Sequence, residues 1–189
     1  MSLLLYGENL ALVRGGRLLF EGLDIALAPG ETLHVTGPNG CGKSSLLRLV
    51  AGLLRPTAGR IERAAVALAD EKLALDRELP LIGSLSDWMS LNGTPQRLEF
   101  ALNTLNLAGL SPVPVRILST GQLKRATLAR VAASTAPLWL LDEPLNGLDA
   151  SGVDDLAALI DAHTAAGGAV IAASHLTLPG EWRRLELGR

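Results

Sequence analysis

The sequence predicts an α/β fold with a largely parallel core sheet and a small helical lobe inserted into it. In the second half of the chain, short apolar segments alternate with amphipathic ones, and in the first half a compact apolar segment leads through a glycine-rich loop into a helix. Strands that alternate with helices are typical of a parallel sheet covered on both faces. The expected strands are 31–36, 137–141 and 168–174, and the expected helices are 43–54 and 151–164.

Length and charge limit what the chain can be. Its 189 residues, 48% of them hydrophobic, are enough for one domain, 1–189, but few for two unrelated ones. We divide it into a nucleotide-binding core, 1–72 and 119–189, and a helical lobe, 73–118. With 17 basic and 19 acidic residues and no block of like charges, the chain is not expected to bind nucleic acid.

The sequence also predicts the compartment. Cys41 is the single cysteine, which excludes an intrachain disulfide and a cysteine-based zinc site and fits a reducing environment. The N-terminus lacks a basic leader, and the longest apolar run, Ala64–Ala69, is far too short to span a membrane. We therefore expect a chain that is neither exported nor membrane-spanning. A mean hydropathy of +0.30 suggests an apolar partner interface.

The first sixty residues are expected to form short strands and turns that lead into a helix. Residues 18–27 alternate loosely between apolar and polar, 28–31 form a turn, and 31–36 carry apolar side chains at alternate positions. From Lys43 the spacing of apolar residues suits a mostly buried helix that ends before Pro56.

The segment 73–118 differs from the rest because prolines and turn residues punctuate short helical stretches. Thr94 followed by Pro95 predicts a helix start, with Leu98, Ala101, Leu102 and Leu105 on its apolar face. After the lobe, Ser119 and Gln122 have the spacing of a capping box at the start of a helix over 123–133.

A phosphate-binding loop is the strongest functional motif. Residues 37–44 satisfy G-x-x-x-x-G-K-[ST] and lie directly between a predicted strand and a predicted helix, as that motif requires. Backbone N–H groups of such a loop and the helix N-terminus bind phosphate oxygens. We predict that ATP contacts Gly37, Pro38, Asn39, Gly40, Cys41, Gly42, Lys43, Ser44 and Ser45. Lys43 would contact the β- and γ-phosphates, and Ser44 would bind Mg²⁺.

Two adjacent carboxylates end the apolar segment Leu138–Leu141. Ligands bind at the carboxyl edge of a parallel sheet, so Asp142 is expected beside the phosphate-binding loop as an Mg²⁺ ligand. Glu143 is then the candidate base that accepts a proton from the attacking water. The alternative is that Glu143 is only a solvated carboxylate that caps the following turn.

Leu118-Ser-Thr-Gly-Gln122 alone would indicate nothing more than a well-capped helix. Together with the phosphate-binding loop and the acidic strand, however, it matches L-S-[GT]-G-Q, and the chain resembles the ATP-binding-cassette family over nearly its whole length. The resemblance implies a P-loop NTPase core with an antiparallel N-terminal β portion and an Mg²⁺-dependent ATPase of the translocase type.

The resemblance implies further site residues. Leu145–Asp149 looks like the D-loop of the family, and His175 stands where the family has its switch histidine, a catalytic partner of Glu143 and Lys43. The family pairs two subunits head to tail, so the second copy would contribute Ser119, Gly121, Gln122 and Asp149 to each ATP. His34 and His163 match no motif and are interpreted as structural.

Two departures from the family pattern stand out. Arg14 occupies the position of the aromatic residue that stacks on adenine. It either stacks on the base through its guanidinium or is an ordinary solvated arginine. The glutamine that links Mg²⁺ sensing to the helical lobe is absent, and Asp70, Glu71 or Lys72 takes its place. This departure from the family pattern therefore concerns the coupling between ATP and a partner more than ATP binding.

The position of Cys41 in the phosphate-binding loop allows two interpretations. One is an exposed thiol whose alkylation blocks ATP binding and which ATP protects. The other is a buried, inert thiol, because unpaired cysteines are often buried.

Within the family, the segments 138–144, 148–153 and 163–171 and the short length resemble the ATP-binding subunit of the haem exporter of c-type cytochrome biogenesis. That resemblance implies a peripheral subunit on the cytoplasmic face of the inner membrane, docked through residues 73–118 on integral-membrane partners. Three alternatives remain: another short transporter subunit, a soluble cassette ATPase of protein-complex assembly such as iron–sulfur scaffolding, and a pseudo-enzyme that uses ATP as a clamp.

Overall fold

The computed structural model describes residues 3–70, 75–91 and 94–188. In chain order the elements are β1 (Leu5–Arg14), β2 (Arg17–Leu27), β3 (Thr32–Thr36), α1 (Lys43–Val50), β4 (Ala58–Arg63), β5 (Val66–Ala69), α2 (Leu81–Leu91), η1 (Pro95–Arg97), α3 (Leu98–Thr104), η2 (Ala108–Leu110), η3 (Val115–Ile117), α4 (Thr120–Ala132), β6 (Leu138–Asp142), α5 (Ala150–Ala165), β7 (Ala169–Ala173) and β8 (Arg183–Glu186).

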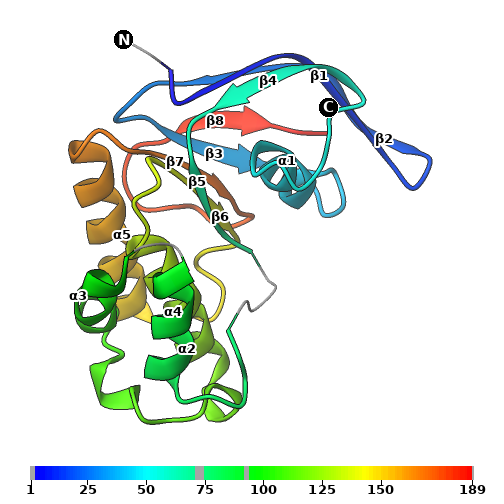
Figure 1. The fold of residues 1–189 in the computed structure, drawn as a ribbon. Helices are drawn as coiled ribbons and strands as arrows, with labels where there is room; N and C mark the ends of the chain where they lie inside the picture. Colours follow the sequence, from blue (N-terminus) through cyan, green and yellow to red (C-terminus); the bar gives the residue numbers. More distant parts are fainter. Residues whose placement is uncertain (1–2, 71–74, 92–93, 189) are drawn as a thin grey trace.

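The strands form two sheets, as Figure 1 shows. One has the order β5-β6-β7-β3-β8, and every neighbouring pair in it is parallel. The other has the order β2-β1-β4, and its pairs are antiparallel. The predicted α/β class, parallel core and antiparallel N-terminal portion are confirmed. The sequence analysis did not separate β4 and β8, whose mostly exposed side chains lack an apolar pattern.

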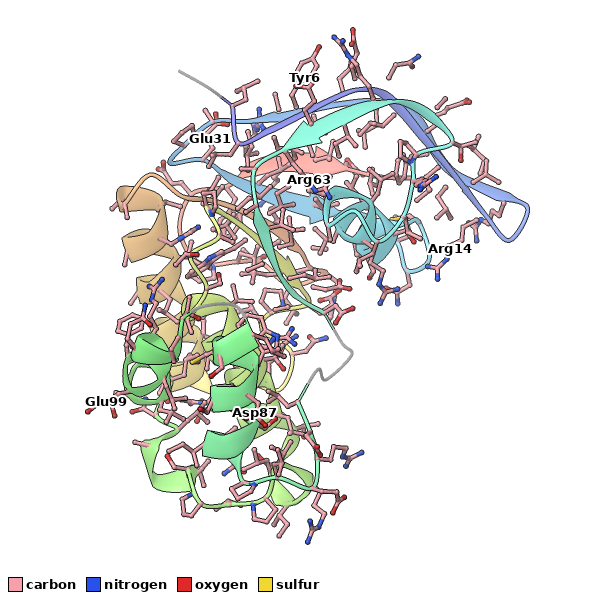
Figure 2. The ribbon with its side chains drawn as sticks, in the orientation of Figure 1. Tyr6, Arg14, Glu31, Arg63, Asp87 and Glu99 are labelled. Atoms are coloured by element: carbon pink, nitrogen blue, oxygen red, sulfur yellow. The ribbon has the colours of Figure 1, made fainter. Side chains whose placement is uncertain are left out.

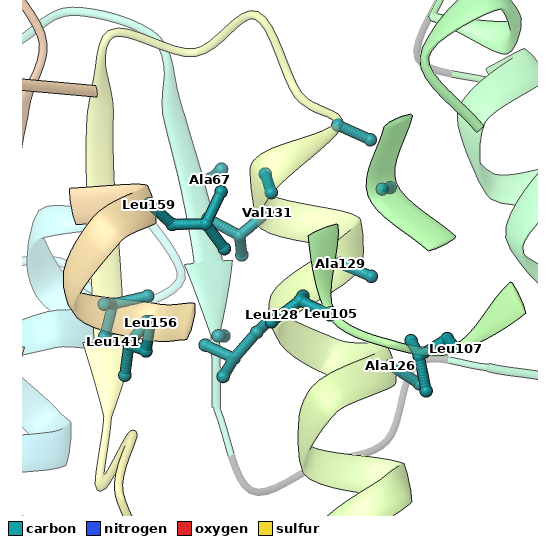
Figure 3. Packing of buried hydrophobic residues seen from close by; sticks show 14 of the residues in the cluster. Ala67, Leu105, Leu107, Ala126, Leu128, Ala129, Val131, Leu141, Leu156 and Leu159 are labelled. Carbon is teal, nitrogen blue, oxygen red and sulfur yellow. The ribbon is translucent and has the colours of Figure 1, made fainter. Parts of the chain in front are cut away.

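Two apolar cores lie on opposite faces of the parallel sheet. One joins α1 and the antiparallel sheet to β3, and the other joins α4, α5 and the lobe helices to β5 and β6. Figure 3 shows the second core, where Ala126, Leu128 and Val131 of α4 meet the strands and the lobe. Because α4 takes part in both the core and the lobe, the two parts share one continuous apolar cluster.

The helix ends differ in places from the expectations. α1 stops at Val50, four residues early, because the N–H groups of Leu53 and Leu54 both turn back to the carbonyl of Arg48. Pro95–Arg97 form a 3₁₀ turn, and α3 starts only at Leu98. The Thr94 side chain makes no capping bond, so proline, rather than a cap, starts this segment.

The predicted capping box is present at α4: the Ser119 hydroxyl accepts from the Gln122 N–H, and the Gln122 side chain accepts from the Ser119 N–H. In α5 the side chain of Asp149 is the N-cap and accepts from the Gly152 N–H. Both candidate partner-facing residues, Ser119 and Asp149, therefore begin helices. Within the described ranges, no helix combines the length and apolar character needed to cross a membrane.

Candidate functional site

The loop between β3 and α1 is held in a conformation that few sequences allow. Gly37 has φ 141°, and a Cβ built on it would lie 2.4 Å from the Leu187 carbonyl oxygen and 2.8 Å from the Cys41 sulfur. Only glycine fits there. The Lys43 ammonium donates to the carbonyls of Gly37, at 2.8 Å, and Pro38, at 3.3 Å. These bonds keep the buried lysine under the loop, next to the N-terminus of α1.

A pocket of about 680 Å³ opens over this loop. It is lined by residues from the loop, from the β1–β2 hairpin and from the segments that follow β6 and β7: Arg14, Leu19, Asn39, Gly40, Gly42, Lys43, Ser44, Ser45, Glu143, Asn146 and His175. The segments after β3, β6 and β7 meet here because parallel strands end at one edge of the sheet. A triphosphate in this pocket would lie between a helix N-terminus and a carboxylate.

Glu143 and His175 form a pair at the pocket wall. The His175 Nδ1–H donates to Glu143 Oε2 at 2.9 Å, and the His175 N–H points to the same oxygen at 3.4 Å. Since a carboxylate only accepts, Nδ1 carries the proton. The Glu143 side chain is 15% exposed and that of His175 is 51% exposed. A carboxylate held in this way can orient a water molecule and accept its proton.

Asp142 ends β6 and is only 2% exposed. The sheet order places β7 between β6 and β3, so Asp142 shares the sheet edge with the phosphate-binding loop without being on a neighbouring strand. The Lys124 ammonium donates to the main-chain oxygen of Asp142 at 2.9 Å. In the part of the chain that the structure describes, no group of three or more His, Cys, Asp or Glu side chains is arranged to hold a metal.

We call Ser119, Gly121 and Gln122 of the L-S-[GT]-G-Q motif the signature residues. With Asp149 they line a second, separate pocket of about 450 Å³, the signature pocket, which includes no residue of the phosphate-binding loop. A Cβ on Gly121 would lie 2.5 Å from the Gly147 carbonyl oxygen, so the first turn of α4 and the loop between β6 and α5 are in close contact at this glycine. Two bonds lower the pKa of Asp149 below its usual value: the N–H of Gly152 and then the Arg125 guanidinium both donate to its carboxylate.

Arg14 lies at the tip of the β1–β2 hairpin, beside the loop that precedes α1 (Figure 2). Its Nη1 is 3.4 Å from the Ser45 hydroxyl. Neither nearby aromatic residue lines the pocket, because Phe20 is buried in the core and Tyr6 lies under Arg60 on the antiparallel sheet. Leu19, which the sequence analysis did not single out, lines the pocket next to Arg14.

Of the three candidates for the missing glutamine, Asp70 alone lies within the described residues; Glu71 and Lys72 lie outside them. The Asp70 carboxylate is 3.6 Å from the Arg48 guanidinium of α1. It also lines a pocket with Glu143 and Asn146. Asp70 thus lies near both the segment after β6 and the helix α1 that follows the phosphate-binding loop.

The Cys41 thiol is buried. Its residue is 7% exposed and belongs to the core cluster beneath the loop, so the reading of an exposed thiol is not supported. His163 stacks on Trp139, with ring centroids 3.8 Å apart, and Nε2 bonds to the Pro137 carbonyl. His34 is buried in β3 and bonds to the Ser174 carbonyl.

Sequence reasoning missed two other residues at these pockets. Asn146 lies in the quoted D-loop segment and lines the first pocket. Arg125 bonds to Asp149, Asp155 and Ser151 and holds α4 against α5. No local signal identifies Arg125, because these three partners are 24 to 30 residues away in the chain.

Comparisons with known proteins agree with this geometry. The family described as ABC transporter matches residues 20–146. "Cytochrome c biogenesis ATP-binding export protein CcmA" of Sphingopyxis alaskensis is 51% identical over 94% of this chain and 93% of that protein. The protein of the same name from Novosphingobium aromaticivorans is 54% identical over 92% and 90%. A solved structure described as the ATP-binding subunit of an ABC transporter superposes with a TM-score of 0.87, at 22% identity, over 97% of this chain and 85% of that one.

Proposed function

The chain belongs to the ABC transporter family, and from this premise we propose that it is the ATP-hydrolysing subunit of a membrane complex that exports haem for c-type cytochrome biogenesis. The observation that carries the catalytic part is one pocket that gathers Lys43, Ser44, Glu143 and His175 from the ends of three parallel strands. The assignment to cytochrome biogenesis rests on the curated relatives of that name, which match over nine tenths of both chains.

In the proposed mechanism, the loop N–H groups and the N-terminus of α1 bind the β- and γ-phosphates, and Lys43 adds a positive charge. Glu143 accepts a proton from the attacking water, and the Nδ1–H of His175 keeps the carboxylate in place. Positioning and charge stabilisation carry most of the rate in phosphoryl transfer. Arg14 and Leu19 are the proposed contacts of the adenine base.

The residues fit a magnesium ion bound together with ATP. A hydroxyl, Ser44, and a buried carboxylate, Asp142, are hard oxygen donors at one sheet edge. Mg²⁺ takes few protein ligands in nucleotide sites, and the rest come from phosphates and water. Bound there, the ion would neutralise charge on the β- and γ-phosphates.

We propose that each ATP site is formed by two copies of the chain, one contributing the phosphate-binding loop and the other the signature residues. The signature pocket, with Ser119 and Gly121, contains none of the residues proposed to contact phosphate in the first pocket. A second copy could place the N-terminus of its α4 against the γ-phosphate, where the helix dipole favours negative charge. The γ-phosphate of ATP would then contact both subunits and stabilise the dimer, and hydrolysis would remove this contact.

We place the membrane partners on the helical lobe. Ile82, Leu91, Phe100 and Ile117 are large apolar side chains that are exposed on its described part, and exposed apolar patches mark protein interfaces. Docking there would hold the chain at the cytoplasmic face of the inner membrane.

The variant Glu143→Gln tests the catalytic proposal. Because the amide cannot accept the proton from water, we expect ATP binding to persist while hydrolysis falls by a factor of roughly 10² or more. The trapped ATP should hold a stable dimer. Nucleotide release and size-exclusion chromatography with ATP measure both effects.

Hydrolysis by Glu143→Gln at the wild-type rate would show that another group is the base. Lys43→Ala is the companion variant, and undiminished ATP affinity there would contradict the role of the loop. Copurification from membranes separates transport from a soluble assembly role: a complex without any integral-membrane protein would refute the transporter proposal.

A further inference from the structure

His34 is a buried titratable side chain that the proposed mechanism does not use. It lies in β3, three residues before the phosphate-binding loop, and is 5% exposed. Leu33 and Val35 on either side of it belong to the core with α1, so His34 faces the other side of the sheet. There its ring meets the edge of Trp182, with centroids 6.3 Å apart.

His34 contacts the residue that precedes His175 of the Glu143–His175 pair. His34 Nε2 is 3.1 Å from the Ser174 carbonyl oxygen, and Ser174 is fully buried. A carbonyl oxygen only accepts, so Nε2 carries the proton and donates it. That carbonyl belongs to the same peptide group as the His175 N–H, which points to the Glu143 carboxylate at 3.4 Å.

The peptide group between Ser174 and His175 is therefore held from both sides: His34 holds its oxygen, and Glu143 faces its nitrogen. The orientation of this peptide sets where the His175 side chain leaves the backbone, and His175 Nδ1 bonds to Glu143 at 2.9 Å. Active sites depend on such supporting bonds, because small displacements of reacting groups cost much of the rate.

From this geometry, and on the basis of the proposed ATPase function, we infer that His34 is a positioning residue for hydrolysis. It fixes the Ser174–His175 peptide and through it the His175–Glu143 pair. His34 does not line the pocket over the phosphate-binding loop. Its replacement should therefore change the rate of the chemical step and not the affinity for ATP.

The test compares two replacements in the full chain, assayed in the assembly in which the wild type turns over ATP. His34→Leu removes the donor, and His34→Gln keeps an N–H donor. We expect His34→Leu to lower kcat about tenfold with KM for ATP within about twofold, and His34→Gln to keep kcat within about threefold. In a His175→Ala background, His34→Leu should change kcat by less than about twofold, because residues that act as a unit are not additive.

His163→Leu is the matched control. His163 Nε2 also bonds to a backbone carbonyl, that of Pro137, but at the opposite edge of the sheet. Its replacement should lower the unfolding midpoint and leave kcat within about twofold. His34→Met provides a second donor-free variant with a flexible side chain.

Wild-type kcat in His34→Leu, or an equal loss in His34→Gln, would overturn the inference. The inference would also be overturned if His34→Leu lowered kcat by the same factor in the His175→Ala background as in the wild type. If neither donor-free variant folds while His34→Gln does, the bond serves the fold and the positioning role is rejected. Absence of ATP hydrolysis by the wild-type assembly would instead refute the proposed function itself.

Discussion

Glu143 shows at the residue scale how the site is held. Its φ of 45° lies in the left-handed region, which costs a non-glycine residue about 1 kcal/mol or more. Three bonds hold it there: its N–H donates to the Ala173 carbonyl at 2.8 Å, and its carboxylate faces the N–H and the Nδ1–H of His175. In this backbone conformation, Glu143 lines the pocket over the phosphate-binding loop.

Cys41 gives a residue-scale prediction. Because the thiol lies in the core beneath the loop and the residue is 7% exposed, we expect a thiol reagent to label the folded chain at least about tenfold more slowly than the urea-unfolded chain. Mg-ATP should change the rate in the folded chain little. Labelling kinetics with and without nucleotide provide the measurement.

Rapid labelling of the folded chain that ATP suppresses would contradict this burial. Such a result would support the alternative interpretation, in which Cys41 is an exposed thiol in the nucleotide pocket. Cys41→Ala serves as the control for labelling elsewhere.

At the scale of elements, arginines on α4 connect the core to its surroundings. Arg130 Nη2 donates to the Leu68 carbonyl of β5 at 3.0 Å, and its guanidinium lies 5.1 Å from the ring centroid of Trp88 on α2. Burial lowers the pKa of Arg130, and the nearby charge of Asp70 opposes this. Arg125, on the same helix, bonds to Asp149 and Asp155 of α5 and its cap. α4 is therefore the element through which lobe, sheet edge and signature pocket are joined.

His163 on α5 gives a prediction at the same scale. Burial against Trp139 lowers its pKa below 6.5. Between the lowered pKa and 6.5 the unfolded chain binds more protons than the folded one, so the free energy of unfolding rises with pH in that window. Acidification below about pH 6.5 should therefore destabilise the wild type more than His163→Gln, which cannot titrate. Urea unfolding between pH 5 and 7.5 measures the difference.

An identical pH dependence of the urea midpoint in both chains would show that His163 does not titrate differently on folding. His34 and His175 are present in both chains, so their contributions cancel in the comparison.

At the scale of the whole molecule, the proposed dimer divides each site between two copies. The phosphate-binding loop lines one pocket and the signature residues line another, and the two pockets share no lining residue. In the proposed head-to-tail dimer, each ATP site takes the phosphate-binding loop from one copy and the signature residues from the other.

Mixing two inactive variants tests the pairing. Lys43→Ala removes the phosphate contact. Ser119→Asp keeps a good helix cap but adds a charge that repels the γ-phosphate. Each alone should be inactive, whereas an equal mixture should recover about a quarter of wild-type ATPase activity per chain, since half of randomly formed dimers are mixed and each has one intact site.

No recovery under conditions where the two variants exchange subunits would contradict the shared site. Full activity of Ser119→Asp alone would show that the signature residues do not face ATP. Light scattering of the mixture verifies that dimers form.

The sequence by itself determined the fold class, the phosphate-binding loop and the capping box at Ser119 and Gln122. Each depends on neighbours in the chain: the period of apolar residues, glycine spacing, or a side chain that bonds three residues away. The same local logic produced the α1 end at Leu54, which was wrong because the N–H groups of Leu53 and Leu54 both turn back to the Arg48 carbonyl.

Only the tertiary structure decided which distant residues meet. His34 matches no motif in the sequence, yet β3 and β7 pair side by side and bring its ring to the Ser174 carbonyl. Likewise, β7 stands between Asp142 and the phosphate-binding loop, and burial, not position in the loop, sets the environment of Cys41. Strand order and burial arise from packing across the whole chain, and no local pattern encodes them.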